Sequence, residues 1–227
     1  MKLDHNLKSM PLVGLFGGAY DPIHNGHLMI ADSLINKLKL DQFFFIPTGI
    51  SVTNKNLTPA NHRLNMIKLA LTNSKLNVST YETDNSLNEG KSYTIDTLKY
   101  FFEKNNAINF FIMGSDNFLK INTWKNWEKL LNYAHIILVD RQISSLSSIN
   151  SSEIKDFLEQ NEEENFSNLK LKRSGYIYKH KVDYIDIASS EIRERLHQGK
   201  EVSNVMPEKI KRYIAANNLY KSFGQIT

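Results

Sequence analysis

Two histidines, His24 and His27, lie three residues apart in the stretch FGGAYDPIHNGH, which covers residues 16–27. Side chains at this spacing share one face of a helix. At the first turn of a helix, imidazoles can donate hydrogen bonds to phosphate oxygens, and the unpaired backbone N–H groups attract the same anion. The pair therefore predicts a site for a triphosphate, with both histidines as catalytic candidates.

Two structural explanations of the histidines stay open at this point. Such a pair near a turn can cap a helix or pack as rings in the core. A metal pair is a weaker alternative, because no third ligand stands nearby in the sequence. The ordered string GGAYDPIHNGH favours phosphate binding, because glycines let backbone amides approach an anion. The string matches neither the GxGxxG nor the GxxxxGK[ST] pattern.

The flanking residues predict the elements that would position this loop. Leu12–Phe16 is a short apolar run that ends at Gly17-Gly18, which indicates a buried strand running into a turn. Apolar residues at helical spacing predict a helix over residues 25–39, and residues 43–46 predict a second strand. This order of strand, helix and strand is typical of a parallel crossover unit.

The same alternation continues along the chain and predicts an α/β protein with a doubly wound parallel sheet and flanking helices. Thr58 is the expected N-cap, and Pro59 the expected first residue, of a helix that ends at Leu71. Later strands are expected at residues 76–80, 108–113, 136–139, 176–178 and 184–187. Later helices are expected at residues 94–104, 189–197 and 207–217, with a helical stretch around the tryptophans.

Composition narrows the class of protein. The chain has 227 residues, of which 41% are hydrophobic and 23% charged, as is typical of a soluble globular protein. The net charge of +4 comes from dispersed basic residues, so we expect binding to neither nucleic acid nor membrane. No apolar run could span a bilayer and no signal peptide is evident, which predicts a cytoplasmic protein. The absence of cysteine excludes disulfides and thiolate chemistry.

The length favours one domain over residues 1–227. Within it, residues 144–175 interrupt the alternation and predict a surface insert, formed by a serine-rich loop and a solvated acidic helix. Residues 189–227 predict a small C-terminal helical part. The oligomeric state stays open.

Further phosphate contacts are expected at the carboxyl ends of the strands and at a second helix start. Ser189 and Ser190 open the helix predicted over residues 189–197, and Arg193 lies on the same side one turn later. An ordinary serine N-cap with a solvated arginine is the alternative. Asp116 follows a predicted strand, where it could meet a ribose hydroxyl or Mg²⁺, or could cap the next helix.

The stretch GLFGGAYDPIHNGHL at residues 14–28 resembles the signature of the nucleotidylyltransferase superfamily, with its HxGH motif, and in particular the bacterial nicotinate-mononucleotide adenylyltransferases. Six further stretches extend the resemblance over most of the chain: IPTG at 46–49, SYTIDTL at 92–98, FIMGSDNF at 111–118, NTWKNWEKLL at 122–131, VDR at 139–141 and ASSEIRERL at 188–196. The insert is the main part without a clear counterpart.

The resemblance implies a Rossmann-like fold and transfer of the adenylyl group of ATP to nicotinate mononucleotide. The mononucleotide phosphate would attack the α-phosphorus in line and expel pyrophosphate, with Mg²⁺ carried by ATP and no protein metal site. It implies catalytic roles for His24, His27 and Arg193. The expected ATP contacts are Phe16, Gly17, Gly18, Lys55, Asp116, Ser189 and Ser190, and the expected mononucleotide contacts are Thr48, Thr94, Trp124, Lys125 and Arg141.

Two departures from the family pattern keep other functions open. Ala188 replaces a hydroxyl residue of the family, and residues 50–55 replace its usual histidine-containing loop, with Lys55 as a substitute cation. The alternatives are an adenylyltransferase for nicotinamide mononucleotide or phosphopantetheine, and a nucleotide-binding regulator with impaired catalysis. An aminoacyl-tRNA synthetase is disfavoured, since the chain leaves no room for a tRNA-reading domain.

Overall fold

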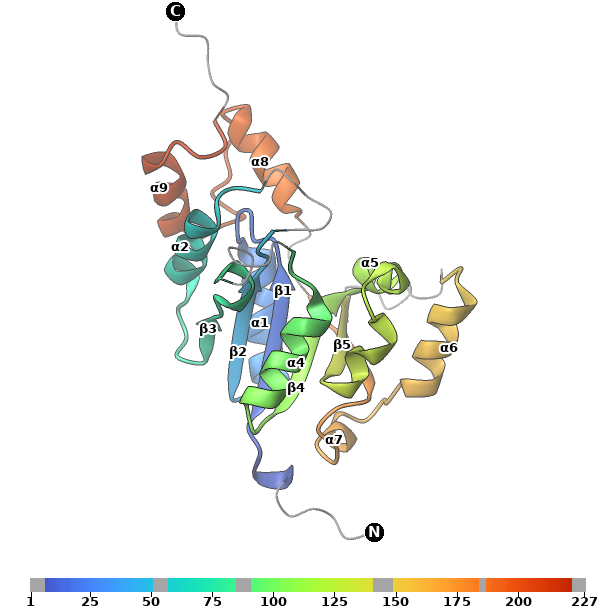
Figure 1. Ribbon diagram of the computed structural model, residues 1–227. Coiled ribbons are helices and arrows are strands. Elements are labelled where there is room, and N and C mark those ends of the chain that lie inside the picture. The colour runs from blue at the N-terminus through green and yellow to red at the C-terminus, as the bar shows by residue number, and fades with distance from the viewer. Residues whose placement is uncertain (1–6, 51–56, 85–90, 141–148, 184–186, 222–227) are drawn as a thin grey trace, which may run out of the picture.

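The computed structural model describes residues 7–50, 57–84, 91–140, 149–183 and 187–221. Its centre is a six-stranded parallel sheet in the order β3-β2-β1-β4-β5-β6 (Figure 1). The strands are β1 (Leu12–Gly18), β2 (Gln42–Pro47), β3 (Leu76–Val78), β4 (Ile108–Gly114), β5 (His135–Asp140) and β6 (Ile177–Lys181).

Helices connect the strands and cover both faces of the sheet (Figure 1). The α-helices are α1 (Asn25–Leu38), α2 (Ala60–Ala70), α4 (Thr94–Lys104), α5 (Ser115–Phe118), α6 (Ser152–Asn161), α7 (Phe166–Leu169), α8 (Ser189–His197) and α9 (Glu208–Ala216). Short 3-10 helices are η1 (Leu7–Ser9), η2 (Ile121–Thr123) and η3 (Trp127–Asn132), and residues 81–84 are also helical. The doubly wound parallel sheet expected from the sequence is thus confirmed.

The strand order reverses direction between β1 and β4, which pair in register with Leu15 opposite Phe111 and Phe16 opposite Ile112. In sheets of this topology, ligands bind outside the carboxyl ends of the strands at this switch point. Helices α8 and α9 lie together with α2 at the carboxyl end of β1, far from the N-terminus of the chain (Figure 1). The loop between β1 and α1, residues 19–24, is called the histidine loop below. It therefore leaves the sheet at the carboxyl end of β1, where these three helices lie.

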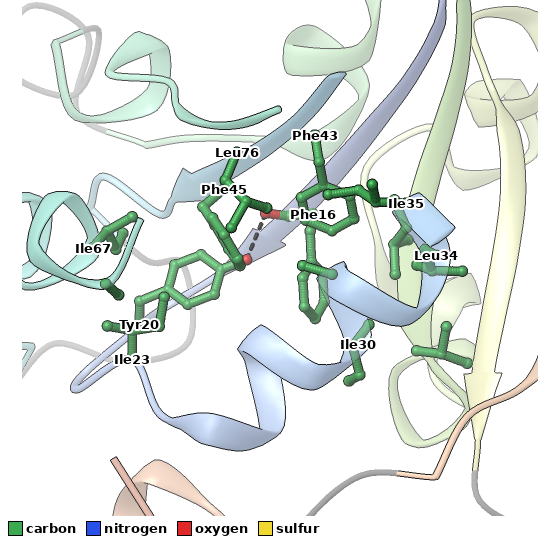
Figure 2. Packing of buried hydrophobic residues seen from close by; sticks show 14 of the residues in the cluster. Phe16, Tyr20, Ile23, Ile30, Leu34, Ile35, Phe43, Phe45, Ile67 and Leu76 are labelled. Carbon is green, nitrogen blue, oxygen red and sulfur yellow. Dashed lines mark hydrogen bonds between the residues drawn. The ribbon is translucent and has the colours of Figure 1, made fainter. Parts of the chain in front are cut away.

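The core has two layers, one on each face of the sheet. Successive strand residues point to opposite faces, so Phe16 joins the layer beside α1 and α2 while Leu15 joins the layer beside α4. Figure 2 shows the first layer, in which Phe43, Phe45 and Tyr20 surround Phe16. Burying one such side chain stabilises the fold by about 1.5–3 kcal/mol.

Some element boundaries differ from those expected. Helices α4 and α8 have the predicted bounds, but α2 begins at Ala60 and Pro59 is its N-cap, one residue later than expected. The stretch around the tryptophans forms the 3-10 helices η2 and η3 instead of an α-helix. The strand expected at residues 176–178 extends to Lys181, and most of the one expected at 184–187 lies outside the described residues.

The insert is less solvated than its composition indicated. Helix α6 buries Ile154 and Leu158 against the layer beside α4, and Leu169 of α7 is buried in the other layer. The Ser151 hydroxyl accepts the backbone N–H of Ile154 and caps α6. The helical part of the predicted insert is therefore anchored in the core by a few apolar residues, while most other residues of α6 are exposed, as expected for a solvated helix.

Gly14 in the middle of β1 tests the packing of this core. A Cβ atom at this position would lie 2.7 Å from Cδ2 of Phe43 and 3.0 Å from Cδ1 of Leu40. We expect Gly14→Ala to lower the free energy of unfolding by about 1–3 kcal/mol, measured by urea denaturation, because the buried Phe43 ring must move. Gly17→Ala is the matched control, since its Cβ would meet only the Phe111 ring at 3.7 Å. Equal effects of the two substitutions would contradict this account.

Candidate active site

The loop between β1 and α1, residues 19–24, is held by hydrogen bonds from distant segments. Arg63 of α2 is only 2% exposed, and its guanidinium donates to the carbonyl of Ala19 at 2.9 Å and to that of Thr58 at 2.8 Å. A buried arginine is stable only where such partners compensate for its lost hydration. The guanidinium thus joins the loop to the segment that precedes α2.

Asp21 receives hydrogen bonds on both carboxylate oxygens. The backbone N–H of Thr58 donates to Oδ2 at 3.0 Å, and the hydroxyl of Tyr220 donates to Oδ1 at 2.5 Å. Burial raises the pKa of Tyr220, with a further contribution from Asp21, so the phenol keeps its proton. The loop is therefore also tied to the end of the described chain.

Helix α8 contacts the same loop through two of its predicted site residues. Arg193 donates from Nη1 to the carbonyl of Asp21 at 2.6 Å, and the Ser189 hydroxyl donates to the carbonyl of Pro22 at 3.0 Å. The N-cap of α8 is Ala188, so no side chain caps its first turn, and the exposed Ser190 follows. The N-termini of α1 and α8 thus lie on either side of residues 21–24, and both can present backbone N–H groups to an anion.

The two histidine rings lie against each other at the start of α1, with their planes tilted by 35°. Their ring centroids are 3.8 Å apart; His24 is the N-cap residue and His27 the third residue of the helix. The backbone N–H of His24 donates to Nδ1 of His27 at 3.3 Å. A neutral His27 must then carry its proton on Nε2, which makes that nitrogen a donor. The capping alternative is therefore correct for His27, and capping leaves its Nε2 as the hydrogen-bond donor.

Burial keeps both imidazoles neutral near pH 7. It lowers the pKa of His24 to about 4, and burial together with the neighbouring His24 lowers the pKa of His27 well below its usual value. The rings of Phe16 and Tyr20 lie 6.0 Å and 5.0 Å from that of His27 and form the apolar surroundings. Nδ1 of His24 is buried without a hydrogen-bond partner among the described residues. An arriving polyphosphate would therefore meet uncharged donors whose proton affinity rises as the anion binds.

The glycines before the histidines serve packing as well as access. A Cβ on Gly18 would lie 3.1 Å from the ring of Tyr20, whose hydroxyl donates to the carbonyl of Phe16 at 2.6 Å (Figure 2). Tyr20 is buried and has a positive φ of 50°. The small residue at position 18 thus lets the aromatic ring fold back over the end of β1.

A cavity of about 620 Å³ opens beside this loop, at the carboxyl ends of β1 and β4. This volume is typical of small-ligand sites. Its walls include seven residues predicted from the sequence: Phe16, Gly17, Gly18, Thr48, Thr94, Trp124 and Lys125.

The far wall of the cavity combines an aromatic face with positive charge. Trp124 is half-buried, with its ring 6.3 Å from that of Phe111 in an edge-on arrangement. Lys125 places its ammonium group 3.3 Å from the Asp96 carboxylate and 4.2 Å from the centre of the Tyr93 ring. Lys120 is a second lysine that lines the same cavity. Such a wall suits a flat aromatic ligand that carries a negative charge.

Three predicted site residues, Asp116, Lys55 and Arg141, are placed neither at the histidine loop nor in the cavity wall. Asp116 is exposed and does not line the cavity, although its neighbours Gly114 and Asn117 do. Lys55 and Arg141 lie outside the described residues, so their expected contacts stay predictions.

Sequence reasoning missed the residues that act through burial: Arg63, Glu82, Thr97 and Tyr220. Glu82 and Thr97 line the cavity, and Arg63 and Tyr220 hold the loop. Arg63 lies among polar residues of α2, where an arginine is normally solvated. No local signal marks these positions, since their partners are brought close only by the fold.

Within the described ranges, no helix is both long and apolar enough to cross a membrane. The same ranges contain no group of three or more His, Cys, Asp or Glu side chains that could hold a metal ion.

Comparison with known proteins places this site in a family. Residues 15–195 match the Cytidylyltransferase-like family. Two curated proteins, both named "Probable nicotinate-nucleotide adenylyltransferase", are similar over nearly their whole length. The one from Clostridium novyi (strain NT) is 36% identical over 92% of this chain and 98% of its own. The one from Buchnera aphidicola subsp. Schizaphis graminum (strain Sg) is 32% identical over 94% of this chain and 98% of its own.

A solved structure shares the fold. It is the Plasmodium falciparum nicotinic acid mononucleotide adenylyltransferase, determined in complexes with APC and with NaAD. The two complexes are 22% and 23% identical to this chain, cover 92% of it and 97% of their own chain, and superpose with a TM-score of 0.67. The chain belongs to the cytidylyltransferase-like family and, within it, to the nicotinate-nucleotide adenylyltransferases.

Proposed function

We propose that the protein transfers the adenylyl group of ATP to the 5′-phosphate of nicotinate mononucleotide, giving nicotinate adenine dinucleotide and pyrophosphate. The observation that carries this proposal is that the histidine loop and the 620 Å³ cavity adjoin each other at the end of β1. The loop bearing His24 and His27 is flanked by the N-termini of α1 and α8, and the 620 Å³ cavity begins at Gly17 and Gly18 of the same strand end. A polyphosphate and a second nucleotide could therefore meet at this edge. ATP is a cytoplasmic metabolite, so we place the reaction in the cytoplasm.

The chemistry needs alignment and charge stabilisation more than a protein nucleophile. A phosphate oxygen of the mononucleotide forms a bond to the α-phosphorus of ATP as the bond from that phosphorus to the bridging oxygen breaks. The electron pair leaves with pyrophosphate, and no proton has to be moved. In this proposal Nε2 of His27 donates a hydrogen bond to the α-phosphate, whose charge density grows in the transition state.

Arg193 and the first turn of α8 would bind the outgoing phosphates. In the structure Arg193 is engaged by the carbonyl of Asp21, so it is already oriented toward residues 21–24. Its guanidinium has further N–H groups for phosphate oxygens. Ser189 and Ser190 lie at the start of the same helix.

The mononucleotide would occupy the cavity beside the loop. Trp124 offers a face for the pyridine ring, and Thr94 begins α4, where free backbone N–H groups can receive the nicotinate carboxylate. The cationic groups of Lys120 and Lys125 favour an acid over an amide at this wall.

We propose that Mg²⁺ enters with ATP. The described residues offer no cluster of side chains to hold it, and the chemistry of Mg²⁺ suits phosphate oxygens with retained water. When bound, the ion would neutralise charge on the triphosphate. The exposed carboxylate of Asp116 would be a candidate for a water-mediated contact with the ion.

Pyrophosphate release in the presence of ATP and Mg²⁺ tests the proposal. We expect release with nicotinate mononucleotide, and much less with nicotinamide mononucleotide or phosphopantetheine. The reverse reaction should regenerate ATP from pyrophosphate and nicotinate adenine dinucleotide. Turnover with phosphopantetheine alone would make the protein a sibling enzyme, and binding of ATP without any turnover would make it a regulator.

His27→Ala should lower kcat by about 100-fold, because it removes a donor aimed at the reacting phosphate. Steady-state kinetics would measure the change, with circular dichroism to confirm that the fold is intact. His197→Ala is the matched control, since His197 is exposed in the last turn of α8. Near-normal turnover of the His27 variant would refute the catalytic role.

Trp124→Ala should raise KM for nicotinate mononucleotide by roughly 5- to 150-fold, the range expected for loss of one stacking contact of about 1–3 kcal/mol. The KM for ATP should change little. Trp127→Ala is the matched control, because Trp127 packs against Phe157 with ring centroids 4.8 Å apart and does not line the cavity. An unchanged KM in the Trp124 variant would show that this ring is part of the core only.

A further inference from the structure

Glu82 is an unexpected group in the wall of a cavity meant for an anion. It lies in the helical residues 81–84 and is 9% exposed. Among the described residues that line the cavity, Glu82 alone carries a carboxyl group. A negative charge at this position would oppose the binding of a ligand that itself carries a carboxylate and a phosphate.

The side chain of Glu82 joins two segments that form the cavity. The Thr97 hydroxyl donates to Oε1 of Glu82 at 2.8 Å, and the backbone N–H of Gly49 also donates to the carboxylate. Gly49 directly follows Thr48, and Thr97 lies one turn after Thr94 in α4. Glu82 thus joins the two segments that carry Thr48 and Thr94, the threonines predicted to contact the mononucleotide.

Among the described residues, ionisable groups from two neighbouring segments face this carboxyl. From α2 the guanidinium of Arg63 approaches it, but two nitrogens of that group already donate to the carbonyls of Ala19 and Thr58. From the histidine loop the phenol of Tyr20 faces it, and the electrostatic effect of Glu82 helps to keep that phenol protonated. Lys120 and Lys125 lie on other parts of the cavity wall.

The balance of these effects leaves Glu82 close to half-protonated near neutral pH. Burial raises the pKa of its carboxyl to about 7, although the hydrogen bonds from Thr97 and Gly49 and the charge of Arg63 oppose the rise. A bound anion in the same cavity would raise the pKa further. By linkage, binding of the anion and binding of a proton must then favour each other.

We propose that Glu82 is a positioning residue that holds the turn after β2 against α4 and is neutral when the anionic mononucleotide is bound. The neutral carboxyl keeps an acceptor for Thr97 and gains a donor, without placing a negative charge beside the ligand. Protonation of Glu82 and uptake of the mononucleotide are therefore one coupled event. This inference rests on the proposed function, since it assumes that the cavity binds nicotinate mononucleotide.

Calorimetric titration of the whole protein with nicotinate mononucleotide from pH 7 to pH 9 tests the coupling. The phosphate of the ligand, with a second pKa of about 6, is at least about nine-tenths ionised in this range. The free histidines at the loop stay neutral there, since the pKa values of both are lowered. We expect the affinity to fall by up to about tenfold per pH unit, and titrations in two buffers of different ionisation enthalpy to show proton uptake on binding.

Two variants separate this coupling from a purely structural role. Glu82→Gln mimics the neutral carboxyl, so its affinity should be independent of pH over this range and should exceed that of the unmodified protein at pH 9. Thr97→Val removes a hydrogen bond that favours the ionised form, so the fall in affinity should move to higher pH. Glu103→Gln, an exposed carboxyl in the same α4, is the matched control and should leave the pH profile unchanged.

The outcomes distinguish this inference from the proposed function. Binding whose pH dependence survives in Glu82→Gln, or binding that is independent of pH in the unmodified protein, overturns the inference and leaves the adenylyl transfer intact. Failure to bind the mononucleotide at every pH overturns both. A pH profile that disappears in Glu82→Gln and shifts upward in Thr97→Val supports the coupling.

Discussion

The site depends on the immobilisation of a short irregular loop between β1 and α1. Its backbone carbonyls at Ala19, Asp21 and Pro22 accept hydrogen bonds from Arg63, Arg193 and Ser189, and the Asp21 carboxylate accepts two more. Each bond is worth only about 0.5–3 kcal/mol, and the larger values apply where one partner is charged. Together they hold the start of α1 in one geometry, which in turn fixes the imidazoles. Catalysis by alignment requires that kind of rigidity.

The charges of the site are arranged so that the protein meets an anion without strong fixed charge at the reacting centre. The histidines are neutral because their rings are buried among Phe16 and Tyr20, and Glu82 is poised near neutrality for the same reason. Fixed cations stand further out, at Arg193 and at Lys120 and Lys125. The histidines and Glu82 are thus uncharged or nearly so, while the cations lie further away. A bound anion can therefore change the protonation of the histidines and of Glu82.

Much of the fold could be predicted from local sequence, and less of the site. The sequence predicted the bounds of α4 and α8 correctly, because the residues that form their apolar faces and their first turns are close together in the sequence. Of the seven cavity residues predicted from the sequence, five lie where the topology brings segments together: Phe16, Gly17 and Gly18 end β1, Thr48 follows β2 and Thr94 begins α4. Glu82 and Arg63 could not be found this way, because their burial depends on contacts between segments far apart in sequence. Asp116 follows its strand as expected but is exposed and does not line the cavity.

The bond between Tyr220 and Asp21 spans 199 positions of the chain. A ribosome would release the first three strands, and with them the glycines and both histidines, long before this tyrosine emerges. A nascent chain at that stage can pair β1 with β2, yet Asp21 still lacks the phenol and the guanidinium of Arg193. The histidine loop therefore acquires all of its hydrogen bonds only after α8 and the segment with Tyr220 have been synthesised and have docked. A chain truncated before them would carry the histidine motif without its geometry.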